Sequence, residues 1–132
     1  MYASAPLAAF QGAGPLAGID QASPHQQIEL LLGGLLARLA RMRGAIRARH
    51  RPARTEAANA ALGILAYLRT ILDPAADPRF VGSLRDLYRY CEARLLEASQ
   101  ADDESAVEEV ILLITEIKTA WDAIAPHRAA VA

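Results

Sequence analysis

The sequence predicts an all-α protein, an antiparallel up-down four-helix bundle with a flexible N-terminal arm. Hydrophobic residues, mostly Ala and Leu, make up 53% of the 132 residues, whereas aromatic residues make up only 5%. This composition favours helices over strands. Apolar residues also recur at steps of three and four in four successive segments, which short polar or Pro-containing stretches separate. The predicted boundaries are an arm over residues 1–22, a bundle over residues 23–125 and a C-terminal tail over residues 126–132.

The arm contains two Pro and three Gly and has no sustained apolar period, which predicts a flexible chain. It also contains apolar side chains, among them Phe10, Leu16 and Ile19, and is too apolar for a purely solvated tail. We therefore expect these side chains to dock on the domain surface. A plain disordered tail is the alternative.

The first helix is predicted to begin at Ser23, which can act as its N-cap. Pro24 suits the first helical position, and Gln26 completes a capping box. We expect this helix to end near His50, because Pro52 follows. Its apolar stripe consists of Ile28, Leu31, Leu32, Leu35, Leu39, Met42 and Ile46.

The second helix is predicted to run from Thr55, as its N-cap, to Leu72. One apolar stripe contains Ala58, Ala61, Leu62, Leu65, Leu68 and Leu72, and a second stripe beside it contains Ile64, Tyr67 and Ile71. A helix that is apolar on two sides must bury the second side as well. A second copy of the chain, the N-terminal arm and a helix of a partner are the candidates for covering it.

The third helix is predicted over residues 79–98, and the fourth starts near Glu104 and ends before Pro126. The fourth helix also has apolar side chains beyond its main stripe, at Ile111, Leu112 and Leu113. The main stripe of the third helix contains Phe80, Leu84, Leu87, Tyr88, Cys91 and Leu95, and that of the fourth contains Val107, Val110, Ile114, Ile117, Trp121 and Ile124.

The charged residues are divided unevenly along the chain, although the net charge is only −1. Residues 1–66 contain seven Arg against three acidic residues, a net charge of +4. Residues 67–132 contain seven basic against twelve acidic residues, a net charge of −5. In an antiparallel bundle such halves attract each other. The small net charge and the lack of aromatic residues among the Arg argue against nucleic-acid binding.

No pattern in the sequence favours an enzyme, a metal site or a cofactor site. His25, His50 and His127 are dispersed, no Cys/His cluster has zinc spacing, and no Gly-rich phosphate loop is present. Cys91 lies on an apolar helix face, so we expect a core residue rather than a nucleophile. A lone Cys fits a reducing cytoplasm, and no apolar run approaches the ~20 residues of a membrane span.

Five short stretches resemble a known family when they are taken in order. They are "SPHQQI" at residues 23–28, "LYRYC" at 87–91, "RLLEAS" at 94–99, "EVILL" at 109–113 and "AW" at 120–121. Together they resemble the FliS family of flagellin-specific flagellar export chaperones, over roughly residues 10–124. The chain departs from the family pattern at Gln27 and Cys91, where Leu and Met are usual. Phe10 stands in place of a Tyr, so it keeps the ring and lacks the hydroxyl.

The resemblance implies a cytoplasmic four-helix-bundle chaperone that is not an enzyme and needs no cofactor. Such a protein binds the disordered C-terminal segment of flagellin, prevents premature polymerisation and delivers flagellin to the flagellar type III export apparatus. The export gate and an anti-sigma factor are further partners to consider, and the free protein could form a homodimer. The alternative function is a helical-bundle regulator that sequesters a transcription regulator such as an anti-sigma factor.

Apolar faces that the bundle does not need could form the groove for such a helical ligand. The arm residues Phe10, Leu16 and Ile19 are expected to cover part of the groove until flagellin arrives. Ordinary core packing is the alternative for each groove residue. The predicted groove residues are Ile64, Tyr67, Leu68, Ile71, Ile111 and Ile114.

Overall fold

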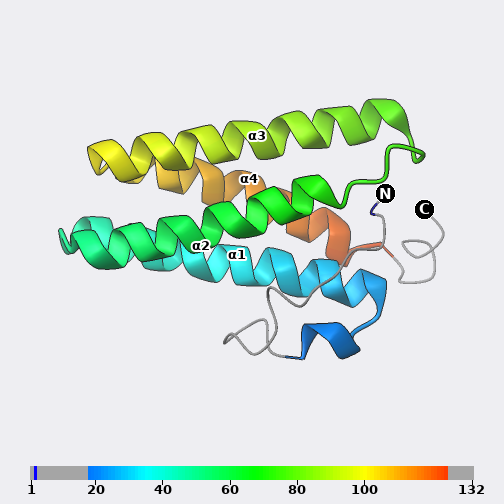
Figure 1. Cartoon of the computed structure of the whole chain (residues 1–132), viewed down its shortest axis with the longest axis horizontal. Helices are drawn as coiled ribbons and strands as arrows, with labels where there is room; N and C mark the ends of the chain where they lie inside the picture. The colour runs from blue at the N-terminus through cyan, green and yellow to red at the C-terminus, as the bar shows by residue number, and fades with distance from the viewer. Residues whose placement is uncertain (1, 3–17, 125–132) are drawn as a thin grey trace.

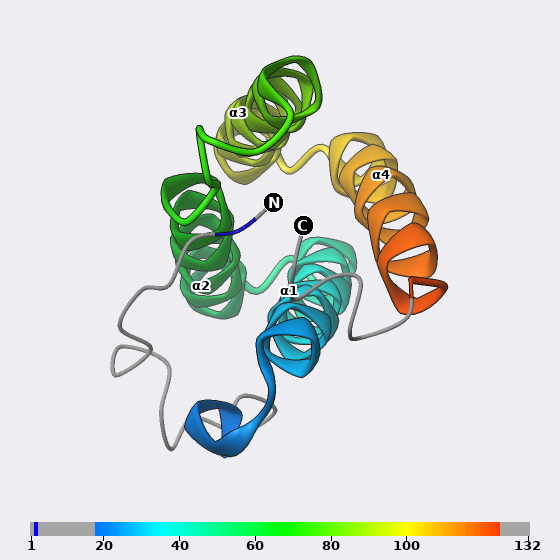
Figure 2. The same cartoon turned by 90° about the vertical axis from the view of Figure 1, so that its right-hand side faces the viewer.

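The structure is a computed structural model, and it describes residue 2 and residues 18–124. Four α-helices run up and down: α1 (Pro24–Arg47), α2 (Arg51–Thr70), α3 (Pro78–Ala101) and α4 (Glu104–Asp122) (Figure 1). Viewed along the bundle in Figure 2, α1 lies beside α2 and α4, and α3 lies beside the same two helices. The predicted all-α four-helix bundle is confirmed.

The predicted capping box at the start of α1 is confirmed. The Ser23 hydroxyl accepts a hydrogen bond from the Gln26 backbone N–H at 3.2 Å, and the Gln26 side chain accepts one from the Ser23 N–H at 3.1 Å. Pro24 occupies the first helical position, where its missing N–H costs nothing. The two reciprocal bonds satisfy backbone donors that the helix itself leaves unpaired. They hold the start of α1 in a fixed place.

The predicted boundary between the first two helices is wrong by three to five residues. Helix α1 ends at Arg47, and Arg49 adopts a left-handed conformation with φ of 54°. The N–H groups of Arg49 and His50 then bond back to the carbonyls of Ile46 and Ala45, which closes the helix as a Schellman motif.

The N-cap of α2 is His50 rather than Thr55. The His50 Nδ1 atom accepts a hydrogen bond from the Ala53 N–H at 3.1 Å. Pro52 therefore lies in the first turn of α2, where Pro is tolerated. Pro52 ended the predicted first helix, but in the structure it lies inside the second.

Aspartate residues cap both remaining helices. The Asp77 carboxylate accepts hydrogen bonds from backbone N–H groups at the start of α3, and Asp103 accepts one from the Ala106 N–H at the start of α4. Helix α3 continues to Ala101, three residues beyond its predicted end. Only Asp102, with a left-handed φ of 52°, and Asp103 separate α3 from α4. The two helices are therefore joined by a tight turn.

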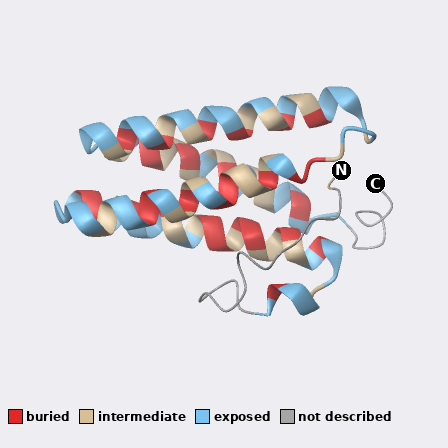
Figure 3. Ribbon diagram, viewed as in Figure 1, coloured by how far each residue is buried: buried red, intermediate tan, exposed pale blue. Residues whose placement is uncertain are grey.

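The core follows the predicted stripes except at Phe80 and Ile124, which are exposed, and the buried residues shown in Figure 3 face the inside of the bundle. Tyr88, Leu35 and Leu95 are fully buried at its centre. Among the described residues, His25 is the only charged or polar residue that is buried. The fold therefore places an imidazole ring inside the core, which also contains the Tyr88 hydroxyl and the Cys91 thiol.

The expected attraction between the two halves of the chain is confirmed at one end of the bundle. Arg47 pairs with Glu104 at 2.8 Å and with Glu108 at 3.4 Å, and Arg54 pairs with Asp102 at 2.7 Å. These pairs join α1 and α2 to the α3–α4 turn. Exposed ion pairs contribute little stability each, so their main effect is on the relative placement of the helices.

Candidate functional site

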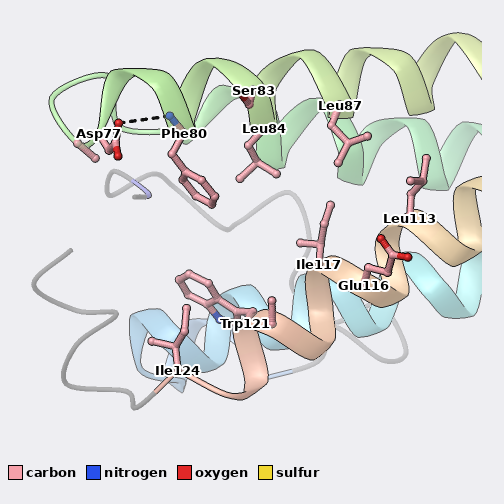
Figure 4. A pocket seen from close by; sticks show the side chains of 12 residues that line it. Asp77, Phe80, Ser83, Leu84, Leu87, Leu113, Glu116, Ile117, Trp121 and Ile124 are labelled. Carbon is pink, nitrogen blue, oxygen red and sulfur yellow. Dashed lines mark hydrogen bonds between the residues drawn. The ribbon is translucent and has the colours of Figure 1, made fainter.

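An open apolar groove of about 590 Å³ lies between the first half of α3 and the second half of α4 (Figure 4). Its lining is almost wholly apolar. Phe80 is 53% exposed and Ile124 is 39% exposed, so the groove presents large apolar side chains to solvent. Acidic residues are present at Asp77 and Glu116. The apolar lining residues are Ala76, Phe80, Leu84, Leu87, Leu113, Ile117, Ala120, Trp121 and Ile124.

The periodicity of the two helices explains why these side chains meet. On α3, Phe80, Leu84 and Leu87 repeat at steps of four and three, which places them on one face. On α4, Leu113, Ile117 and Trp121 repeat at steps of four. A groove of this volume and composition has the size and polarity of a ligand site, and it suits the apolar face of a helical segment.

Polar contacts tie α3 and α4 together beyond the groove. The Glu109 carboxylate of α4 accepts a hydrogen bond from the Tyr90 hydroxyl at 2.6 Å and another from Arg94 Nε at 2.7 Å. The Tyr90 hydrogen bond and then the Arg94 hydrogen bond hold the pKa of Glu109 below its usual range. The helices are thus linked near the Asp102 turn, and their opposite ends form the groove.

Trp121 forms part of the groove wall and is held from three sides. Its indole Nε1–H donates a hydrogen bond to the main-chain carbonyl of His25 at 3.0 Å. The His25 imidazole stacks on the indole with ring centroids 4.9 Å apart and an interplanar angle of 15°. The Tyr2 ring meets it edge-on at 5.7 Å. Residues from both ends of the chain therefore shape this wall.

None of the six predicted groove residues lines this groove. Ile64, Leu68, Ile71 and Ile114 are buried in the core, with at most 5% of each residue exposed. Tyr67 and Ile111 are partly buried and pack against the core. Burial favours the core-packing alternative for the four buried residues. Direct contact of any of the six with a partner stays a prediction.

Of the three predicted arm residues, the structure describes one. Ile19 is fully buried in the short 3-10 helix η3 (Ile19–Gln21), which packs against α1. Phe10 and Leu16, like residues 126–132, lie outside the described residues. Tyr2 is another of the apolar arm side chains, and it contacts the bundle: its ring meets Trp121 and its backbone bridges to Leu72.

The sequence pattern identified most of the groove residues as apolar helix positions but assigned them to the core. Phe80, Leu84 and Leu87 belonged to the main stripe of the third predicted helix, and Ile117, Trp121 and Ile124 to that of the fourth. Leu113 belonged to the apolar side chains beyond the main stripe of the fourth predicted helix. Such a signal shows which side chains share a face, but it does not show where two neighbouring helices leave that face uncovered.

No helix of the described part of the chain is both long and apolar enough to cross a membrane. Within residue 2 and residues 18–124, no three His, Cys, Asp or Glu side chains gather as a metal-binding group. Cys91 is buried, and burial raises the pKa of its thiol to about 12. The groove is therefore the feature among the described residues that has the properties of a ligand site.

The fold and the groove together define a small all-α four-helix bundle with an open apolar groove. The family described as flagellar protein FliS matches residues 9–128. The chain is 38% identical over 124 residues to the flagellar secretion chaperone FliSB of Pseudomonas aeruginosa, covering 94% of this chain and 98% of that protein. It is 33% identical over 127 residues to the flagellar secretion chaperone FliS of Salmonella typhimurium, covering 96% and 94%. The chain belongs to the FliS family.

Proposed function

We propose that this protein is a flagellar secretion chaperone that holds the C-terminal segment of flagellin, with an apolar helical part of that segment in the α3–α4 groove. Bound in this way, flagellin is kept from polymerising before the flagellar type III apparatus exports it. The relatives' names support the chaperone role. The open groove with Phe80 and Ile124 exposed is the observation that carries the proposed binding site.

The chemistry of the groove suits such a ligand. A subunit that polymerises through helical segments offers apolar faces, and an apolar groove can cover one of them. A disordered segment loses conformational entropy when it orders, so it must bury a large surface to bind well. The α3–α4 groove supplies one part of that surface. The partly buried Tyr67 and Ile111 are candidates for further contacts along the bundle.

The protein acts in the cytoplasm, binds without catalysing a reaction, and brings flagellin to the export gate. The arm covers apolar surface of the bundle in the free state through Phe10 and Leu16, and Ile19, which is buried against α1, anchors it. The burial of Ile19 supports an attachment of the arm to α1.

Binding is tested by calorimetry with the flagellin of the same organism, full-length and without its C-terminal segment. We expect the full-length protein to bind and the truncated one not to bind. Phe80→Ser should weaken binding by about 10- to 100-fold, because a central apolar contact is lost. The melting temperature should stay close to that of the original protein, because Phe80 is 53% exposed.

Leu112→Ser is the matched control, because Leu112 is 67% exposed but does not line the groove. It should bind like the original protein. Equal binding of full-length and truncated flagellin would refute the proposed ligand. Equal loss in the two variants would refute the proposed position. The regulator alternative predicts that an anti-sigma factor competes with flagellin for Phe80-dependent binding.

A further inference from the structure

We infer that His25 is a positioning residue for the groove: it fixes the Trp121 indole as part of the groove wall through ring stacking and its main-chain carbonyl. Only the effect of His25 on flagellin affinity rests on the proposed function; its effect on the position of Trp121 does not. His25 belongs to the "SPHQQI" stretch, and its side chain has no other role in the features described above. It lies in the first turn of α1 and contacts Trp121 of α4, which Figure 4 shows at the groove.

The contacts of His25 leave the indole little freedom. The imidazole covers one face of the indole at 4.9 Å and 15°, and the His25 carbonyl accepts the indole N–H at 3.0 Å. Stacking fixes the plane of the indole, and the hydrogen bond fixes its direction within that plane. Trp121 is 6% exposed, yet it lines the groove, so its placement decides the shape of the wall.

The imidazole is itself held in place. His25 is 3% exposed, and its Nε2 atom lies 2.7 Å from a carboxylate oxygen of Glu29, one turn further along α1. The carboxylate can only accept, so Nε2–H is the donor. The ring plane is therefore set by Glu29 on one side and presented to Trp121 on the other.

The second ring nitrogen of His25 distinguishes a positioning role from simple filling of the core. The Nδ1 atom of His25 is buried and has no hydrogen-bond partner among the described residues. An unpartnered buried polar atom destabilises a fold, and an apolar side chain would avoid that cost. The imidazole combines a flat face for Trp121 with an N–H for Glu29, which no aliphatic side chain provides.

The capping box explains how the ring reaches this position. Ser23 and Gln26 fix the first turn of α1, and His25 lies between them at the second helical position. Its carbonyl and side chain both face Trp121 of α4, which is distant in sequence. A preorganised wall loses less entropy when a ligand binds, so holding Trp121 raises affinity for the ligand.

The test uses the full chain and the fluorescence of Trp121, the only Trp in the sequence. His25→Ala removes the stacked ring, His25→Phe restores a flat ring without the N–H, and His50→Ala is the matched control. His50→Ala also removes a His ring, the N-cap of α2, but it takes no contact from Trp121. Three quantities are measured: acrylamide quenching of Trp121, binding of the neutral apolar dye Nile red, and affinity for the flagellin C-terminal segment.

We expect His25→Ala to increase acrylamide quenching about threefold and to weaken binding of both ligands up to about tenfold, the effect of freeing one side chain. His25→Phe should return all three quantities to within about twofold of the original values, since stacking is restored. His50→Ala should lower the melting temperature without changing the three quantities, because the lost cap belongs to α2.

Unchanged quenching and unchanged dye binding in His25→Ala, with only a lower melting temperature, would overturn the positioning role. Failure of His25→Phe to restore quenching would overturn it as well. If the original protein binds Nile red but no flagellin segment, the proposed function fails. The quenching and dye results of the variants still decide the role of His25 in that case, because neither measurement depends on flagellin.

Discussion

The hydroxyl groups of Tyr2 and Tyr88 share a hydrogen bond, although 86 positions separate them in the sequence. Tyr88 is fully buried in α3, and its burial raises its pKa to about 12. Desolvation raises the pKa of Tyr2 as well. The same Tyr2 ring contacts Trp121 at the groove wall. The start of the chain is thus joined to both helices that form the groove.

Tyr2→Phe is expected to destabilise the protein by about 1–3 kcal/mol, because it leaves the buried Tyr88 hydroxyl without its partner. Adding Tyr88→Phe should recover part of the loss, because the double variant has no unpaired hydroxyl at this site. Urea unfolding followed by circular dichroism measures both effects. If the double variant is less stable than Tyr2→Phe, the hydrogen bond is not the source of the loss.

Cys91 is expected to resist a thiol reagent while the protein is folded. The residue is fully buried, and a pKa of about 12 leaves only about one thiol in ten thousand ionised at pH 8. Labelling with Ellman's reagent should therefore proceed at the rate at which the structure opens. The control is the same reaction in urea, which should be complete at once. Immediate labelling of the folded protein would contradict the buried position.

Glu109→Gln tests the link between α3 and α4 through acid sensitivity. Hydrogen bonds from Tyr90 and Arg94 lower the pKa of Glu109 in the folded state. A lowered folded pKa gives stabilisation that is complete above about pH 5 and is lost as pH falls through the folded value. The original protein should therefore exceed Glu109→Gln in stability at pH 7, and the difference should shrink on acidification.

Stability curves at several pH values measure this difference. Glu116→Gln is the control, because Glu116 is exposed and has no ion-pair partner among the described residues. It should show no such convergence with pH. A Glu109→Gln difference that is constant from pH 7 to pH 3 would contradict the assignment.

Leu68→Ala distinguishes core packing from partner contact at a predicted groove residue. Leu68 is fully buried, so we expect a loss of about 2–5 kcal/mol in unfolding free energy. Ile111→Ala should lose less, because Ile111 is only partly buried. Urea unfolding and flagellin binding are measured together, well below the melting temperature. Retained stability with lost binding in Leu68→Ala would instead support the original groove prediction.

The sequence pattern predicted the four helices well, but their boundaries less well. The cap at Ser23 was predictable, because one side chain and two neighbours define it. The start of α2 was not, because Thr55 is a better N-cap in sequence than His50. The left-handed conformation of Arg49 ends α1 early, so that His50 rather than Thr55 caps α2. A non-glycine residue in that conformation is uncommon, so no pattern in the sequence indicated it.

The groove was harder to predict than the helices. The second stripe of α2, with Ile64 and Ile71, is covered because α2 packs between α1 and α3. The exposed apolar surface lies instead on Phe80 and Ile124, which the pattern assigned to the core. Periodicity gives the angular width of an apolar face, but the packing of neighbouring helices decides which part of it stays open.

The two-residue turn at Asp102 joins α3 and α4 at one end, so a change in the angle between them moves their distant ends most. About 30 Å of helix separates this turn from Phe80, whereas Arg94 lies only about 12 Å from it. A change of about 5° in the angle between the helices would therefore move Phe80 by about 3 Å but Arg94 by only about 1 Å. The width of the groove is therefore sensitive to small changes in this angle, and Tyr2, which contacts Tyr88 of α3 and Trp121 of α4, is placed to limit them.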